Sequence, residues 1–188
     1  DANACVIDGT GASAHILIMS DNSSCYNLAI TNAPSPYAAV YNNSSNFAFQ
    51  MMQVTISNSH LGMVLENSAF DNVFAYLNDC AFSGNQSGDL LMNSNFSSNT
   101  VNFYGFSTSY YSTNTGGIAV QIVGQHTIFN SIGEQAEKDP TNVNGTFLSI
   151  ENGSVAHING ASLLYYGVGI VVPNDFYTPT LTADGIIS

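Results

Sequence analysis

The sequence has almost no positive charge. Its 188 residues contain one Lys or Arg, namely Lys138, against 13 Asp and Glu, which gives a formal net charge of −12. A chain with a single Lys and no Arg cannot neutralise nucleic-acid phosphates, and the same shortage of cations excludes attraction to anionic lipid surfaces. We therefore expect no nucleic-acid partner and no binding to a membrane surface.

Long apolar runs and cysteines are also scarce. The longest apolar stretches are interrupted by Gly and are too short to span a bilayer, so we expect no membrane insertion. Three cysteines cannot form a disulfide framework; Cys5 and Cys25 could pair across neighbouring repeats, or the cysteines are simply small buried residues. The four His and three Cys show no metal-ligand spacing, and no phosphate-binding motif is present, so we expect no metal site and no cofactor.

The polar surface must come from uncharged residues, because only 7% of the chain is charged. A surface rich in Asn, Ser, Thr and Tyr is typical of an extracellular, cell-surface or virion-surface protein, and we expect that location. N-glycosylation sequons add to this expectation, although a chain rich in Asn and Ser also produces them by chance. The seven sequon asparagines are Asn22, Asn42, Asn43, Asn85, Asn95, Asn144 and Asn152.

An apolar residue recurs along the whole chain at a nearly constant interval, and a constant interval of roughly 25 residues indicates a repeat architecture. The members of this column are Ile7, Ile30, Ile56, Phe82, Phe106, Ile132 and Ile158. The next residue is mostly small and polar, and the one after it is often Gly or Asn, which accept a left-handed backbone at low cost. Each repeat is thus predicted to contain a short strand that ends in a tight bend.

A second apolar run follows each bend, as in 61–65 and 168–172. A β-sandwich gives no reason for the same strand to recur at a fixed interval, whereas a solenoid does, because each coil stacks on the last and extends one continuous core.

These inward apolar columns and Asn- or Gly-rich bends resemble those of the right-handed parallel β-helix (pectin-lyase-like) superfamily, in its tail-spike and adhesin-like branch. The resemblance implies an all-β solenoid of about seven coils, ~23–26 residues each, over the single domain 1–188, which is either whole or a segment of a longer spike. Ile186 follows Ile158 by about one period, which indicates that another coil begins there. Lyases, hydrolases, spikes and adhesins share this fold, so it does not specify an activity.

Catalytic residues are hard to find in this chain. The resemblance implies that elimination would need an Arg or Lys base; this chain has no Arg, and we expect its one Lys, Lys138, to lie in a loop. The best carboxylate cluster is Glu134, Glu137 and Asp139 in 133–146, which we expect to be a loop, with one or two helical turns at most in 132–139. Such carboxylates could be the acid and base of a polysaccharide-degrading glycoside hydrolase, or simply part of a solvated loop.

We therefore expect a non-enzymatic spike, fibre or adhesin module that attaches to host or cell-surface glycans. Tyr104, Tyr110 and Tyr111 are the candidates for stacking on sugar rings. Because no capping helix is evident, we also expect self-association into a homotrimer or a filament. A flat row of small residues leaves an ice-binding solenoid as a minor alternative, with plain outer-sheet packing as the simpler interpretation; the row is Thr31, Ser57, Ser83 and Ser107.

Overall fold

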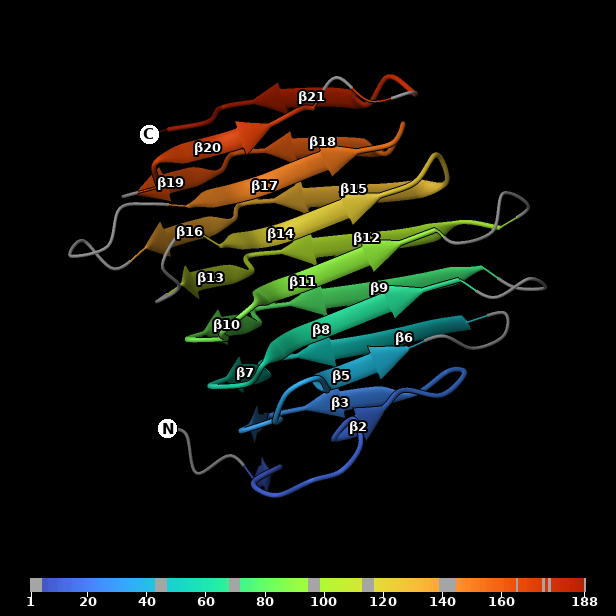
Figure 1. Cartoon of the computed structure of the whole chain (residues 1–188), viewed down its shortest axis with the longest axis vertical. Helices are drawn as coiled ribbons and strands as arrows, with labels where there is room; N and C mark the ends of the chain where they lie inside the picture. The colour runs from blue at the N-terminus through green and yellow to red at the C-terminus, as the bar shows by residue number, and fades with distance from the viewer. Residues whose placement is uncertain are drawn as a thin grey trace.

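The computed structural model describes residues 5–42, 47–67, 72–94, 99–112, 117–138, 145–164, 166–173, 175 and 177–187. These residues form 21 β-strands in three parallel sheets of seven strands each (Figure 1). No described residue belongs to a helix, so this part of the chain contains no helical candidate for a membrane span. The predicted all-β solenoid is confirmed.

The three sheets, called A, B and C here, are built from every third strand. Sheet A contains β1 (Cys5–Asp8), β4 (Leu28–Thr31), β7 (Thr55–Ser57), β10 (Ala81–Ser83), β13 (Ser109–Ser112), β16 (Gln135–Lys138) and β19 (Ser162–Leu164). Sheet B contains β2 (Leu17–Ile18), β5 (Ala38–Asn42), β8 (Leu61–Glu66), β11 (Gly88–Asn93), β14 (Ile118–Val123), β17 (Thr146–Glu151) and β20 (Val168–Val171). Sheet C contains β3 (Ser24–Tyr26), β6 (Phe47–Met52), β9 (Val73–Asn78), β12 (Val101–Phe106), β15 (Thr127–Ile132), β18 (Val155–Asn159) and β21 (Thr180–Asp184).

One coil is therefore a strand of sheet A, then one of B, then one of C. The seven layers make about six turns, close to the predicted seven coils. Figure 1 shows the layers stacked along the long axis, with the first and last coils at opposite ends. Ile187 adds a parallel bridge to Ser162 of β19, and Ile186 packs against the core, so a further coil begins there as expected.

The inward column of sheet A is set by the register of its strands. It runs through Ile7, Ile30, Ile56, Phe82, Tyr110, Ala136 and Leu163. The first four members are those that the periodicity predicts. The last three expected members are wrong, because Phe106, Ile132 and Ile158 lie in sheet C. Within sheet C the expected column breaks again, since Ile132 pairs with Asn159 and Ser131 pairs with Ile158.

The slip has a physical cause: left-handed residues occur at more than one corner of the coils. The corner after sheet A has positive φ at Asn32 (63°), Asn58 (51°) and Gly84 (65°), as predicted. The corner between sheets C and A repeats the same requirement in every coil. Its members are Asn27, Gln53, Asp79, Ser107, Gly133, Gly160 and Gly185. Similar residue types therefore mark both corners. The predicted column follows sheet A in its first four members and sheet C in its last three.

The core lies inside the three sheets and contains almost no water-accessible apolar surface. Aromatic rings of successive coils stack within it: Phe103 on Phe129, and Phe82 on Tyr110, each pair with ring centroids 5.2 Å apart. Because parallel pairing repeats the same side-chain position in every layer, like residues meet directly above one another. The result is a rigid rod whose outer faces are regular columns of side chains.

Candidate functional site

The predicted catalytic carboxylates lie on opposite sides of one sheet. Glu134 immediately precedes β16 and is 1% exposed, whereas Glu137 on β16 is exposed. Two residues three apart in extended chain point to opposite faces, so these carboxyl groups cannot flank one glycosidic bond. Asp139 lies outside the described residues. The acid–base assignment to Glu134 and Glu137 is therefore wrong.

The expected loop at 133–146 is also wrong in its first part. Residues 135–138 form β16, which pairs with β13 on one side and β19 on the other. The local preference for a helical turn in 132–139 gives way to this pairing, because a coil without its sheet A strand leaves the backbone groups of both neighbours unpaired.

The three predicted sugar-stacking tyrosines do not come together. Tyr110 is 1% exposed and belongs to the core, so it cannot contact a sugar, and burial raises its pKa well above the usual value. Tyr111 is 37% exposed on the outer face of sheet A. Tyr104 is half-buried on the outer face of sheet C, where its ring stacks on Tyr76 with centroids 5.0 Å apart. The prediction is wrong for Tyr110, and the other two lie on different faces.

Two of the sequon asparagines are buried. Asn42 is fully buried, and Asn85 is 1% exposed. The side-chain amide of Asn85 donates to Asp89 Oδ1 at 2.8 Å and to the Ile56 carbonyl at 3.3 Å. A side-chain nitrogen buried inside the fold cannot carry a glycan in the folded chain, so the prediction fails at these two positions.

The other described sequons are accessible. Asn22 and Asn152 occupy turns with φ of 56° and 51°, and both side chains reach solvent. Asn43, Asn95 and Asn144 lie outside the described residues. N-glycosylation at Asn22 and Asn152 remains a prediction.

The predicted disulfide does not form. Cys5 lies on β1 in sheet A, Cys25 lies on β3 in sheet C, and both are free, as is the buried Cys80. The Cys25 thiol instead contacts the Met19 sulfur at 3.9 Å. Spacing along the chain suggested neighbouring coils, but the two cysteines belong to different sheets.

The predicted row of small residues is shorter than expected. Thr31, Ser57 and Ser83 pair in register on the outer face of sheet A. The next member is Tyr111 rather than Ser107, and Glu137 and Leu164 follow. Larger side chains therefore end the flat row after the first four coils. Ice binding remains a minor, untested prediction.

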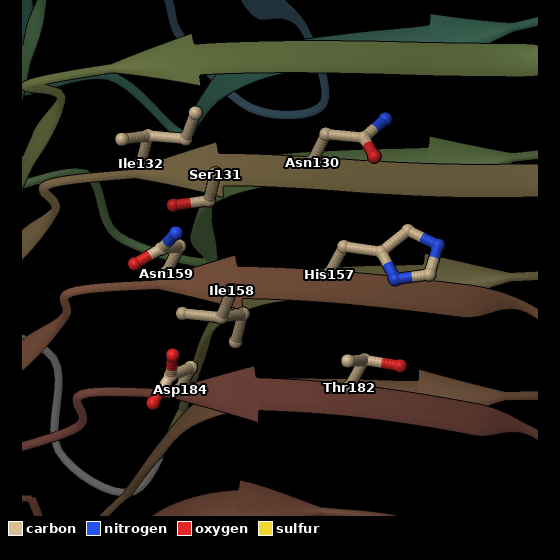
Figure 2. Close-up of a pocket in the computed structure, with 8 residues that line it drawn as sticks. All are labelled: Asn130, Ser131, Ile132, His157, Ile158, Asn159, Thr182 and Asp184. Atoms are coloured by element: carbon tan, nitrogen blue, oxygen red, sulfur yellow. The ribbon is translucent and has the colours of Figure 1, made fainter.

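A groove lies on the outer face of sheet C, near its last strands. Its volume is about 280 Å³, and Figure 2 shows two columns of side chains along it. One wall consists of Asn130, His157 and Thr182, and the other of Ile132, Asn159 and Asp184. Ser131 and Ile158 lie between the two walls. We call this feature the sheet C groove.

The two columns continue beyond the groove toward the first coils. Through β12 and β9 the first column reaches Tyr104 and then Tyr76, and the second reaches Phe106. Phe106 is 44% exposed and Ile132 is 49% exposed. Solvent-exposed aromatic and aliphatic side chains in a contiguous patch are characteristic of a binding surface.

The sheet C groove combines polar side chains with a larger apolar surface, and it is almost uncharged. Asn130 is held in place by a hydrogen bond that its amide donates to the Phe103 carbonyl at 3.3 Å. Asn159 and His157 add further donors and acceptors, and Asp184 contributes one carboxylate. None of the described side chains that line the groove is Lys or Arg. Among the described residues, no group of three or more His, Cys, Asp or Glu side chains is placed to hold a metal ion.

No protein-family model, curated protein or solved structure matches this chain. The resemblance to the pectin-lyase-like superfamily therefore holds at the level of a parallel β-solenoid and no further.

Sequence reasoning missed the sheet C groove, although one signal was available. The sheet C strands β9, β15 and β18 alternate between buried and less buried residues, so every second residue faces outward. Aligning those strands with each other, rather than with sheet A, brings Asn130 beside His157 and Ile132 beside Asn159. Without the register of the strands, the sequence does not show that these groove residues are neighbours.

Proposed function

We propose that this protein is a non-catalytic β-solenoid that binds a neutral glycan along the sheet C groove. The observation that carries the proposal is the presence of two kinds of side chain on one surface: amide, imidazole and hydroxyl groups, and beside them the exposed Ile132 and Phe106 and the half-buried Tyr104. Sugar rings present hydroxyls at their edges and apolar C–H groups on their faces, so they need both kinds of contact.

Charge favours a neutral ligand over an acidic one. The chain carries a formal net charge of −12, and Asp184 is the charged residue of the groove. A sulfated or uronic-acid polymer would meet repulsion from both and no compensating cation. Neutral, hydroxyl-rich glycans of a host or cell surface fit these conditions.

Binding of host or cell-surface glycans implies a location outside the cell. We propose that the protein is displayed on an extracellular, cell or virion surface as a spike, fibre or adhesin module. Its surface supports this, because polarity comes mainly from amides and hydroxyls rather than from charges. We further propose that copies associate with one another. Apolar side chains exposed on the last described coil, such as Val168, Val172 and Tyr177, are suited to such a contact.

The decisive experiment is a glycan array with the wild-type protein and a His157→Ala variant. We expect neutral glycans to bind and the variant to bind about tenfold more weakly, since losing a hydrogen bond and its ring contact costs about 1.4 kcal/mol. His126→Ala is the matched control, because His126 lies in the turn between β14 and β15, outside the groove.

Two results would contradict the proposal. Equal binding by wild type and His157→Ala would show that the groove is not the binding site, even if the protein binds a glycan. Preferential binding of sulfated or uronic-acid glycans would overturn the charge argument.

A further inference from the structure

The interior of the solenoid contains a carboxylate in a column of small and apolar residues. Backbone hydrogen bonds between successive coils align the residue that precedes each of the later sheet A strands. The members are Val54, Cys80, Thr108, Glu134 and Ala161. Glu134 is the acidic member of this column, and it is 1% exposed.

The surroundings of Glu134 are built around it. The Tyr110 hydroxyl donates to Glu134 Oε1 at 3.3 Å. Gly105 faces the same carboxyl: a Cβ atom there would lie 3.1 Å from Glu134 Oε1 and 2.8 Å from the Phe103 ring. Any larger residue at Gly105 would therefore crowd the carboxyl group. The Glu134 side chain thus occupies space that its neighbours, Gly105 among them, leave open.

Three buried oxygens in this cluster have no partner in ordinary hydrogen-bond geometry: Glu134 Oε2, Ser131 Oγ and Thr108 Oγ1. An ionised carboxylate here would be a buried charge with no cation among the groups that act on it, and such a charge is costly even where hydroxyl groups donate to it. A protonated carboxyl group instead supplies a donor, and a hydroxyl oxygen of Ser131 or Thr108 can accept it.

The titratable groups nearby act on Glu134 through Tyr110 or act on Tyr110 itself. Tyr110 on β13 is the direct partner, and Asp89 and Cys80 help to raise the pKa of the same phenol. Asp89 also acts on Tyr166. Burial raises the pKa of Glu134 from 4.5 to about 8, while the nearby Ser131 hydroxyl and Tyr110 oppose this rise. The carboxyl group is thus mostly protonated at neutral pH.

We propose that Glu134, Tyr110, Ser131 and Thr108 form a buried proton-binding site that loads on folding and makes the solenoid more stable in acid than in mild alkali. The unfolded carboxyl titrates near 4.5, and the folded one near 8. Between these values the folded state holds one proton more than the unfolded state, so stability falls as pH rises through this window. The folding equilibrium constant falls by up to about tenfold per pH unit and levels off above the folded pKa.

The first test compares urea unfolding of wild type, Glu134→Gln and Glu137→Gln from pH 5 to pH 9. Glutamine keeps the shape and the donor of a protonated carboxyl group but does not titrate. The folding constant of Glu134→Gln divided by that of the wild type should therefore rise steeply with pH. Glu137→Gln is the matched control, because Glu137 is an exposed carboxylate on the adjoining strand, and its ratio should stay flat. A flat ratio for Glu134→Gln overturns the proposal.

A second test does not depend on that variant folding. At pH 7 the infrared spectrum of the wild type should contain the carbonyl band of a protonated carboxylic acid, which disappears as pH rises past about 8. Asp89→Asn and Glu137→Gln should retain the band, which assigns it to Glu134. Tyr110→Phe should move its loss to higher pH, because the phenol no longer stabilises the carboxylate. Absence of the band at pH 7 refutes the site.

Discussion

At the scale of single residues, two glycines are required for different reasons. Gly133 has φ of 68° at a corner, and the atom nearest to an added Cβ is Ser107 Oγ at 3.9 Å, so space is available there. Gly62 on β8 does not need a left-handed backbone. A Cβ on Gly62 would lie 2.4 Å from the Asp89 carbonyl oxygen of β11. Gly133 is thus required for its left-handed backbone, and Gly62 is required because a side chain does not fit there.

We expect Gly62→Ala to lower the free energy of unfolding by about 2–3 kcal/mol, because a backbone carbonyl in a paired strand cannot move aside. Gly133→Ala should cost about 1–2 kcal/mol, the penalty of a left-handed Ala. Gly169→Ala is the control, since its Cβ would meet only the flexible end of Leu163 at 3.2 Å. Urea unfolding measures all three; equal losses for Gly62→Ala and Gly169→Ala would contradict the steric argument.

At the scale of strands and corners, the sequence predicts the kind of element well and its sheet less well. Asn32, Asn58 and Gly84 were predicted as bends from residue type alone, because few residues tolerate positive φ. The column then failed at Tyr110, because the step in sheet A from Phe82 to Tyr110 is longer than the step before it. Corner lengths vary, and only strand pairing fixes which residues share a layer.

The same limit explains why the candidate site could not be predicted. Tyr76 and Tyr104 are neighbours in sheet C although a whole coil of chain separates them, and the same holds for Asn130 and His157. Spacing alone also could not tell that Glu134 faces inward and Glu137 outward. That difference depends on the register of β16, which its partners in sheet A determine.

Aromatic stacking within sheet C yields a prediction for the core. Phe103 is fully buried and stacks on Phe129 of the next coil. Phe103→Ala should lower the free energy of unfolding by about 3–5 kcal/mol, since it removes buried apolar surface and leaves a cavity between coils. Phe103→Leu should lose less, because most of the volume stays. Chemical denaturation with both variants measures this; a loss below about 1 kcal/mol for Phe103→Ala would show that the coils close over the gap.

At the scale of the whole molecule, exposed apolar surface and net charge have opposite effects on association between copies. A rod with exposed apolar groups on its last described coil favours association, whereas a net charge of −12 favours separation at low ionic strength. We expect association to be strengthened by salt, because screening removes the repulsion and leaves the apolar contact.

Sedimentation or native mass measurement at low and high salt tests this expectation. Multiples of the mass of one chain, more abundant at high salt, would support a homotrimer or filament. A monomer at every salt concentration would contradict self-association, without affecting the glycan-binding proposal.

The direction of the backbone hydrogen bonds gives the rod a mechanical character. Neighbouring strands in each sheet belong to successive coils, so the bonds between them run along the long axis. A pull that separates the two ends therefore loads these bonds one layer at a time. Each detached coil of roughly 25 residues releases chain on the order of 90 Å long when fully extended. A solenoid of this kind yields stepwise under tension and lengthens without losing its remaining layers.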